Sequence, residues 1–200
     1  RVITIEDSAE LQIHGIENLV RMEVRQADGD GVSNVTLRDL IRTSLRMRPD
    51  RIIVGEVRGE EALDMIQSMN TGHDGSLSTG HANSPQDMLS RLETMALFAS
   101  DIPIQAIRKQ IASSIDIIVQ LERLRDRSRR VTAIAEVLDC TEDAYILNPI
   151  FEFHEQDNLV MESSSYGDIP ERVVGQLERT GYHLMHRRKL HAAALESAEI

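Results

Sequence analysis

Residues 51–58 read Arg-Ile-Ile-Val-Gly-Glu-Val-Arg, and this stretch decides the fold of the chain. Three consecutive β-branched residues that end at a glycine are typical of a buried strand in a mostly parallel sheet. The stretch then delivers a carboxylate, Glu56, to the carboxyl end of the strand, where open α/β sheets bind their ligands. We therefore predict a central strand that presents a functional glutamate.

Predicted helices and strands alternate on both sides of this stretch. We expect a buried strand at residues 2–5, an edge strand at residues 19–25, a short strand at residues 76–79, and helices starting near Thr36, Glu60, Ser84 and Pro103. This alternation up to about residue 122 predicts an α/β layer with a mostly parallel sheet. The apolar stretches after it, at residues 117–121, 131–138 and 145–153, predict a late antiparallel β-meander.

A change of composition after Asp157 suggests where the domain ends. We expect one domain over residues 1–156 and a tail over residues 157–200. Within the tail, residues 163–165 are typical of a linker, residues 169–181 predict a short capped helix, and residues 192–194 predict a frayed one.

The bulk composition excludes some classes of function. A net charge of -11 argues against nucleic acid as the main partner, because phosphate backbones are bound by clustered Lys and Arg. Nucleotide binding stays possible, since a phosphate site is local and built largely from backbone N–H groups. The single Cys140 excludes a disulfide framework and fits a reducing cytoplasm. No apolar run approaches the roughly 20 residues that span a bilayer.

Three polar segments carry groups suited to phosphoryl transfer. They are residues 5–10 (Ile-Glu-Asp-Ser-Ala-Glu), residues 52–58, and residues 71–83, in which two Gly-His pairs bracket a short strand. A carboxylate at a strand end can hold Mg²⁺ through its water shell, and a second can orient the attacking water. Imidazoles can hydrogen-bond a γ-phosphate.

In this order the segments resemble the Asp box, Walker B motif and His box of the type II/type IV secretion ATPase superfamily. The resemblance covers about residues 1–155, and residues 110–116 and 129–131 are most similar to CpaF-type ATPases of tight-adherence pili. It implies a RecA-like domain with ATP and Mg²⁺ as cofactors. Glu56 would be the Walker B acid acting on Mg²⁺ and the lytic water, Glu6 the Asp-box glutamate, and His73 and His81 the His-box pair. Arg58 would pair with a carboxylate or a phosphate.

The Gly-Lys-Ser/Thr loop of this superfamily is not in the sequence. The two lysines, Lys109 and Lys189, do not follow a glycine. The chain opens without Met on a β-rich run, so we expect it to be a fragment whose phosphate-binding loop and first strand lie upstream. The resemblance also implies a hexameric ring, a cytoplasmic position at the inner membrane, and pilus or secretion platform proteins as partners.

Other interpretations remain open. The chain can be a non-catalytic assembly module that keeps the fold, or a metal-dependent hydrolase that uses His73, Asp74 and His81. Glu56 can be an ordinary solvated residue at the end of a strand, and both histidines can be loop residues whose ring nitrogens bond to backbone groups. The basic run from Arg123 to Arg130 can be a solvated turn or a surface for an acidic or membrane-bound partner.

Overall fold

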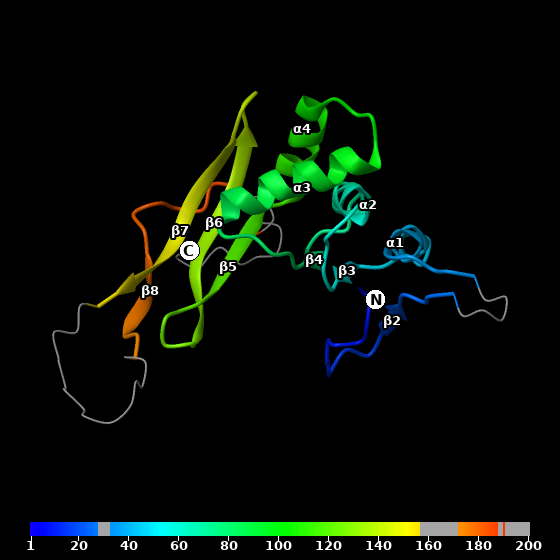
Figure 1. Ribbon diagram of the computed structural model, residues 1–200, viewed down its shortest axis with the longest axis horizontal. Coiled ribbons are helices and arrows are strands. Elements are labelled where there is room, and N and C mark those ends of the chain that lie inside the picture. Colours follow the sequence, from blue (N-terminus) through cyan, green and yellow to red (C-terminus); the bar gives the residue numbers. More distant parts are fainter. Residues whose placement is uncertain (28–32, 157–171, 188–189, 191–200) are drawn as a thin grey trace. The chain divides into compact units, whose positions relative to one another are not determined.

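The computed structural model describes residues 1–27, 33–156, 172–187 and 190, which belong to two compact units, Arg1–Ile115 and Asp116–Ile200. The first unit contains, in chain order, β1 (Val2–Glu6), β2 (Leu19–Glu23), α1 (Leu37–Leu45), β3 (Arg51–Val54), α2 (Glu61–Met69), β4 (Leu77–Ser78), α3 (Pro85–Ala99) and α4 (Ile104–Ser114) (Figure 1). The second contains β5 (Ile117–Arg123), β6 (Arg129–Cys140), β7 (Tyr145–Glu155) and β8 (Gly175–Arg179).

The first unit is built on a parallel sheet with the strand order β2-β1-β3-β4. As predicted, β3 is an inner strand and β2 lies at the edge. One face of the inner strands carries the aliphatic core: Ile3 pairs with Ile52 and Ile5 with Val54, and all four side chains are at most 1% exposed. Helix α1 packs against β1 and β2.

The connection from β1 to β2 lies against the other face of the sheet. Side chains alternate between the two faces along a strand. Glu6 and Arg21 therefore point to the face opposite the one that carries the buried isoleucines of β1. Arg21 Nη2 donates to the carbonyl of Ile13 at 2.8 Å, and the Glu6 carboxylate accepts from the N–H groups of Glu10 and Leu11. The connection is therefore fixed beside the end of β1.

Local chemistry sets where the helices begin. At the predicted helix start, Thr36 forms a capping box, in which its hydroxyl accepts from the N–H of Asp39 at 3.2 Å and its own N–H donates to the Asp39 carboxylate at 2.9 Å. Ser84 caps α3 through its hydroxyl, which accepts from the N–H of Asp87 at 3.1 Å, and Pro85 occupies the first helical position. Among the described residues, no helix is long and apolar enough to cross a membrane.

The second unit is an antiparallel sheet with the order β5-β6-β7-β8, which confirms the predicted meander. The helix predicted over residues 169–181 is wrong for its described part, because residues 175–179 form β8 on the free edge of β7. Gly175 disfavours a helix by about 1 kcal/mol. It also suits the strand, since a Cβ there would lie 2.5 Å from Phe153 Cζ.

The two compact units divide between Ile115 and Asp116, whereas the change in composition suggested a boundary between residues 156 and 157. Residues 175–179, which belong to the predicted tail, pair with the sheet formed by residues 117–155. The predicted linker at residues 163–165 and the frayed helix at residues 192–194 lie outside the described residues.

A buried carboxylate holds the last described segment onto the second sheet. Glu136 on β6 is 1% exposed and accepts from the N–H groups of Met185 at 2.9 Å and His186 at 2.7 Å, and from Asn148 Nδ2 at 2.9 Å. Burial disfavours the charged form, but the hydrogen bonds outweigh it and hold the pKa of the Glu136 carboxyl below its ordinary value. The ionised group therefore stabilises the folded unit.

We predict that Glu136→Gln lowers the free energy of unfolding of the second unit by about 2 kcal/mol at pH 7, because charge-assisted hydrogen bonds are lost. A lowered folded pKa gives stability above the ordinary glutamate pKa of about 4.3, which is lost as the pH falls through the folded value. The variant and the original chain should therefore converge in acid. Tyrosine fluorescence in urea measures this unit, since all three tyrosines follow residue 116 and there is no Trp.

Glu152→Gln is the control, because Glu152 is exposed on β7. A Glu136 variant as stable as this control at pH 7 would contradict the anchoring role of the carboxylate.

Candidate functional site

The carboxyl ends of β1, β3 and β4 meet at one edge of the parallel sheet. Glu6 is the last residue of β1, Glu56 follows β3, and His81 follows β4. Carboxyl ends of neighbouring parallel strands lie at the same edge, which is where open α/β sheets bind ligands. The structure thus places three of the predicted site residues along one edge.

Glu56 and His81 face each other across this edge. Glu56 Oε1 lies 3.4 Å from His81 Nε2, and the side chains are 37% and 82% exposed. The loops that carry them are tied together, because Val57 N donates to the carbonyl of Thr79 at 3.0 Å and the Thr79 hydroxyl donates to the carbonyl of Gly55. A carboxylate and an imidazole are therefore held side by side while open to a ligand.

Glu6 has a different environment from Glu56. It is 5% exposed, and its Oε1 accepts from the N–H groups of Glu10 and Leu11, both at 3.0 Å. Gly55 permits this position, since a Cβ there would lie 3.0 Å from Glu6 Cγ. Glu6 therefore orders the loop after β1, whereas the Glu56 carboxylate stays accessible.

Arg58 pairs with a carboxylate, which is one of the two partners that the sequence left open. Its guanidinium contacts the carboxylate of Asp7, and the side chains are 61% and 39% exposed. The backbone around Arg58 is fixed by Glu61, whose Oε1 accepts from the N–H groups of Arg58 and Gly59, both at 2.8 Å. This ion pair links the loop after β3 to the loop after β1.

The structure does not bring His73 to the other site residues. His73 precedes β4, and its Nδ1 lies 3.2 Å from the carbonyl of Ser68 at the end of α2. The neighbouring Ser76 hydroxyl accepts from the N–H of Ile52, near the start of β3. His73 therefore lies at the amino edge, opposite Glu56, and is satisfied by a backbone group.

This separation argues against the metal-dependent alternative. In the part of the chain that the structure describes, no group of three or more His, Cys, Asp and Glu side chains is placed to hold a metal ion. The metal site of His73, Asp74 and His81 is thus not formed. The accessible Glu56 carboxylate does suit Mg²⁺, because this ion usually keeps several of its waters and takes one or two carboxylates.

Sequence reasoning missed Asp7, Glu61 and Thr79 as individual residues. Asp7 was visible in the acidic run after β1, and Thr79 lies between the two Gly-His pairs. The partners of Asp7 and Thr79 do not follow from the sequence, because their contacts join segments that are far apart along the chain, whereas Glu61 accepts from Arg58 and Gly59 nearby in the sequence.

Comparisons with known proteins find similarity for both the sequence and the fold. Residues 1–165 match the family described as type II/IV secretion system protein. The conjugal transfer protein TrbB of Rhizobium radiobacter is 36% identical over 137 residues, and the type IV secretion system protein PtlH of Bordetella pertussis is 35% identical over 133 residues. These alignments cover 68% and 65% of this chain, and the chain spans 39% of the length of each relative.

A solved structure gives the same result for the fold. The VirB11 ATPase from the Brucella suis type IV secretion system, in complex with sulphate, superposes with a TM-score of 0.60 and 32% identity. The match covers 68% of this chain and 40% of the other. It confirms the RecA-like α/β class that the sequence predicted.

We predict that the two histidines differ in their effect on stability. His73→Ala should lower the free energy of unfolding of the first unit by about 1 kcal/mol, because a hydrogen bond at the end of α2 is lost. His81→Ala should change it by less than about 0.5 kcal/mol, because the side chain is mostly solvent-exposed. Urea denaturation followed by helical circular dichroism measures this unit, which holds helices α1 to α4. The reverse order of the two variants would contradict the separation of the histidines.

Proposed function

Because this chain belongs to the type II/IV secretion system protein family, we propose that it is part of a motor that hydrolyses ATP to drive secretion or pilus assembly. The observation that supports this most directly is the pair of Glu56 and His81 at the carboxyl edge of the parallel sheet. Phosphoryl transfer needs positioning and charge near the γ-phosphate more than covalent chemistry, and an exposed carboxylate beside an imidazole offers both.

We assign Glu56 to the lytic water and to the water shell of Mg²⁺, since its carboxylate is the accessible one at this edge. Bound Mg²⁺ would supply neutralising charge for the phosphate oxygens. His81 would donate a hydrogen bond to the γ-phosphate. Glu6 would act through the loop that it orders, and Arg58 would either keep its ion pair with Asp7 or pass to a phosphate.

His73 is kept among the proposed nucleotide-site residues only because of the resemblance to the His box. Its contacts at the amino edge favour a contribution to the loop between α2 and β4. In the assembled protein it could still report the nucleotide state through that loop, because the loop continues through β4 to His81.

The assembly and the pathway are further proposals for the whole protein. Relatives named for conjugal transfer and type IV secretion favour a motor beside a membrane-bound machine. Residues 110–116 and 129–131 favour the CpaF type, and thereby tight-adherence pili, over other branches. We propose a hexameric ring in the cytoplasm, peripheral to the inner membrane, with platform proteins of the pilus or secretion system as partners.

A second candidate function is an assembly module without ATPase activity. It is favoured by one observation, the absence of a Gly-Lys-Ser/Thr loop in this sequence, whose lysine would reach the β- and γ-phosphates. We expect this 200-residue segment to be inactive by itself and to hydrolyse ATP in a chain that supplies the loop. Loss of turnover on mutation of the strand-end glutamate separates the two functions.

We predict that Glu56→Gln lowers ATP turnover by at least about 100-fold, because the lytic water loses its base. The test uses a chain extended on its amino-terminal side through a phosphate-binding loop. Nucleotide affinity, measured by calorimetry, should change little, since glutamine keeps the size and one oxygen of the side chain.

The matched control is Glu17→Gln, an exposed glutamate in the connection between β1 and β2. It should keep normal turnover. Normal turnover in Glu56→Gln as well would rule out the assigned role, and a parent chain that binds no ATP would favour the assembly module.

A further inference from the structure

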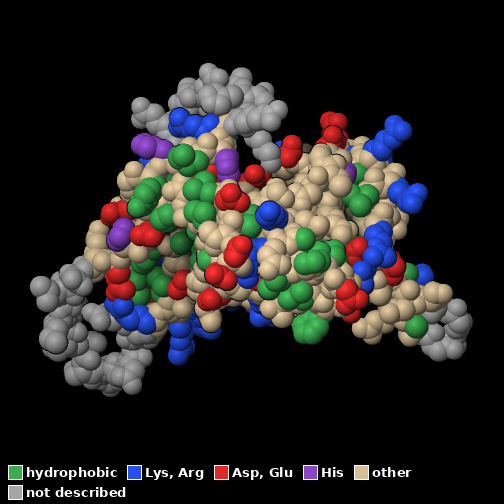
Figure 2. Space-filling model, turned by 90° about the horizontal axis from the view of Figure 1, so that it is seen from above, with side chains coloured by type: hydrophobic (Ala, Val, Ile, Leu, Met, Phe, Trp, Pro, Cys, Tyr) green, Lys and Arg blue, Asp and Glu red, His purple; other side chains and the backbone are tan. Residues whose placement is uncertain are grey.

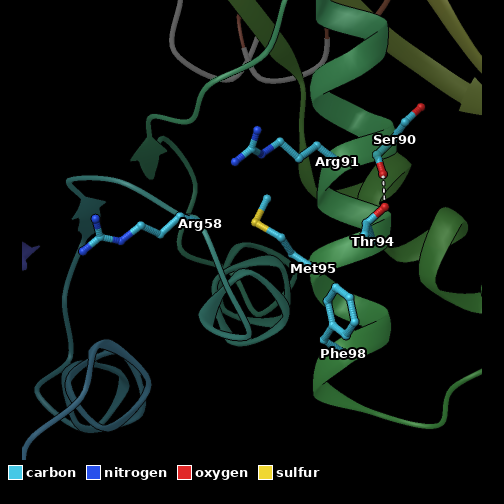
Figure 3. A pocket seen from close by; sticks show the side chains of 6 residues that line it. All are labelled: Arg58, Ser90, Arg91, Thr94, Met95 and Phe98. Carbon is cyan, nitrogen blue, oxygen red and sulfur yellow. Dashed lines mark hydrogen bonds between the residues drawn. The ribbon is translucent and has the colours of Figure 1, made fainter.

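A surface hollow of about 420 Å³ lies beside helix α3, within the first unit. Figure 3 shows its lining: one side chain comes from the loop after β3, and the others line up along α3. The lining residues are Arg58, Ser90, Arg91, Thr94, Met95 and Phe98. None of them has a place in the proposed hydrolysis except Arg58.

The hollow combines an apolar surface with two arginines. Met95 is 5% exposed, whereas Phe98 is 76% exposed and its neighbour Leu97 is 42% exposed. An aromatic ring this open is notable in a chain with three Phe, three Tyr and no Trp. Exposed aromatics beside Arg are the residue types that dominate binding energy at protein interfaces. On the face shown in Figure 2, apolar side chains are exposed in small groups between charged ones.

The charge of the hollow is opposite to that of the chain. The net charge is -11, yet the charged side chains of the lining are both arginines. The side chain of Arg91 is exposed and makes no hydrogen bond or ion pair with any described residue, and Arg58 is balanced by Asp7. Charge complementarity therefore selects an acidic ligand. The exposure of Phe98 leaves the hollow too open to bury a small molecule, which normally loses most of its surface.

We propose that this hollow binds an acidic segment of a partner protein, which places a carboxylate between Arg58 and Arg91 and an aliphatic or aromatic side chain against Met95 and Phe98. The carboxylate pairs with Arg91 and competes with Asp7 for Arg58, and the apolar side chain covers the exposed ring of Phe98. This binding claim does not depend on ATP hydrolysis.

The same arginine couples the hollow to the site edge. Arg58 is paired with Asp7, which follows the buried Glu6, and Glu6 orders the amides of Glu10 and Leu11. A partner carboxylate competes with Asp7 for Arg58, so that binding loosens the loop after β1. The consequence for nucleotide turnover rests on the proposed function, whereas the competition itself can be measured without nucleotide.

The experiment uses the 200-residue chain and an array of short synthetic peptides that pair Glu, Gln or Lys with Leu, Phe or Ala. Glu-Leu and Glu-Phe peptides should bind, and the Gln and Lys versions should bind at least about 10-fold more weakly. Fluorescence anisotropy with the best peptide should show a loss of about 10-fold for Arg91→Glu and for Phe98→Ala. Asp7→Asn should tighten binding, because it removes the competitor.

Matched controls are Arg46→Glu and Leu77→Ala, exposed residues of the same unit outside the hollow, and both should bind like the original chain. Three results would overturn the proposal. The chain could prefer the Lys peptides, bind no peptide of the array, or bind the best peptide equally well after Arg91→Glu. Self-association that disappears in Phe98→Ala also overturns it, because the occupant is then a second copy. Weaker binding in Asp7→Asn overturns the competition.

Discussion

The parallel pairing of β1 with β3 is the constraint on which the rest of the first unit depends. Ile5 pairs with Val54, and Gly55 N donates to the carbonyl of Ile5 at 2.8 Å. The register is fixed by burial, because a slip of one residue turns every buried side chain to the other face. Because the two strands stay in register up to Ile5 and Val54, Glu6 and Glu56 lie at the same edge of the sheet. Gly55 completes the arrangement by leaving room for the Glu6 side chain.

The side chains at the two edges of this sheet make different kinds of contacts. At the carboxyl edge, the side chains of Glu56 and His81 are exposed, and the contact between them is a long one of 3.4 Å, so their polar groups are available to a ligand. At the amino edge, His73 and Ser76 satisfy backbone groups and fix the end of α2. The stabilising contacts and the proposed chemistry therefore lie at opposite ends of the strands. The ion pair of Arg58 with Asp7 then connects the chemical edge to the surface of α3.

The sequence alone predicted those features that depend on neighbouring residues. The β-branched run at residues 52–54 and the helix start near Thr36 both depend on local chemistry, and the structure confirms them. Features set by distant contacts were out of reach. Residues 175–179 form a strand because β7 offers a free edge, and His73 lies away from His81 because β4 runs between them. The partner of Arg58 comes from the loop after β1, which no local pattern reveals.

The most direct test of the central claim is a nuclear magnetic resonance titration of the extended chain with Mg²⁺ and a non-hydrolysable ATP analogue. The account predicts that amide signals shift at the carboxyl edge, in residues 6–10, 55–58 and 79–82, while residues 73–76 at the amino edge change little. Saturable shifts centred on residues 73–76, with the carboxyl edge unaffected, would contradict the account, because the nucleotide would then bind at the wrong end of the sheet.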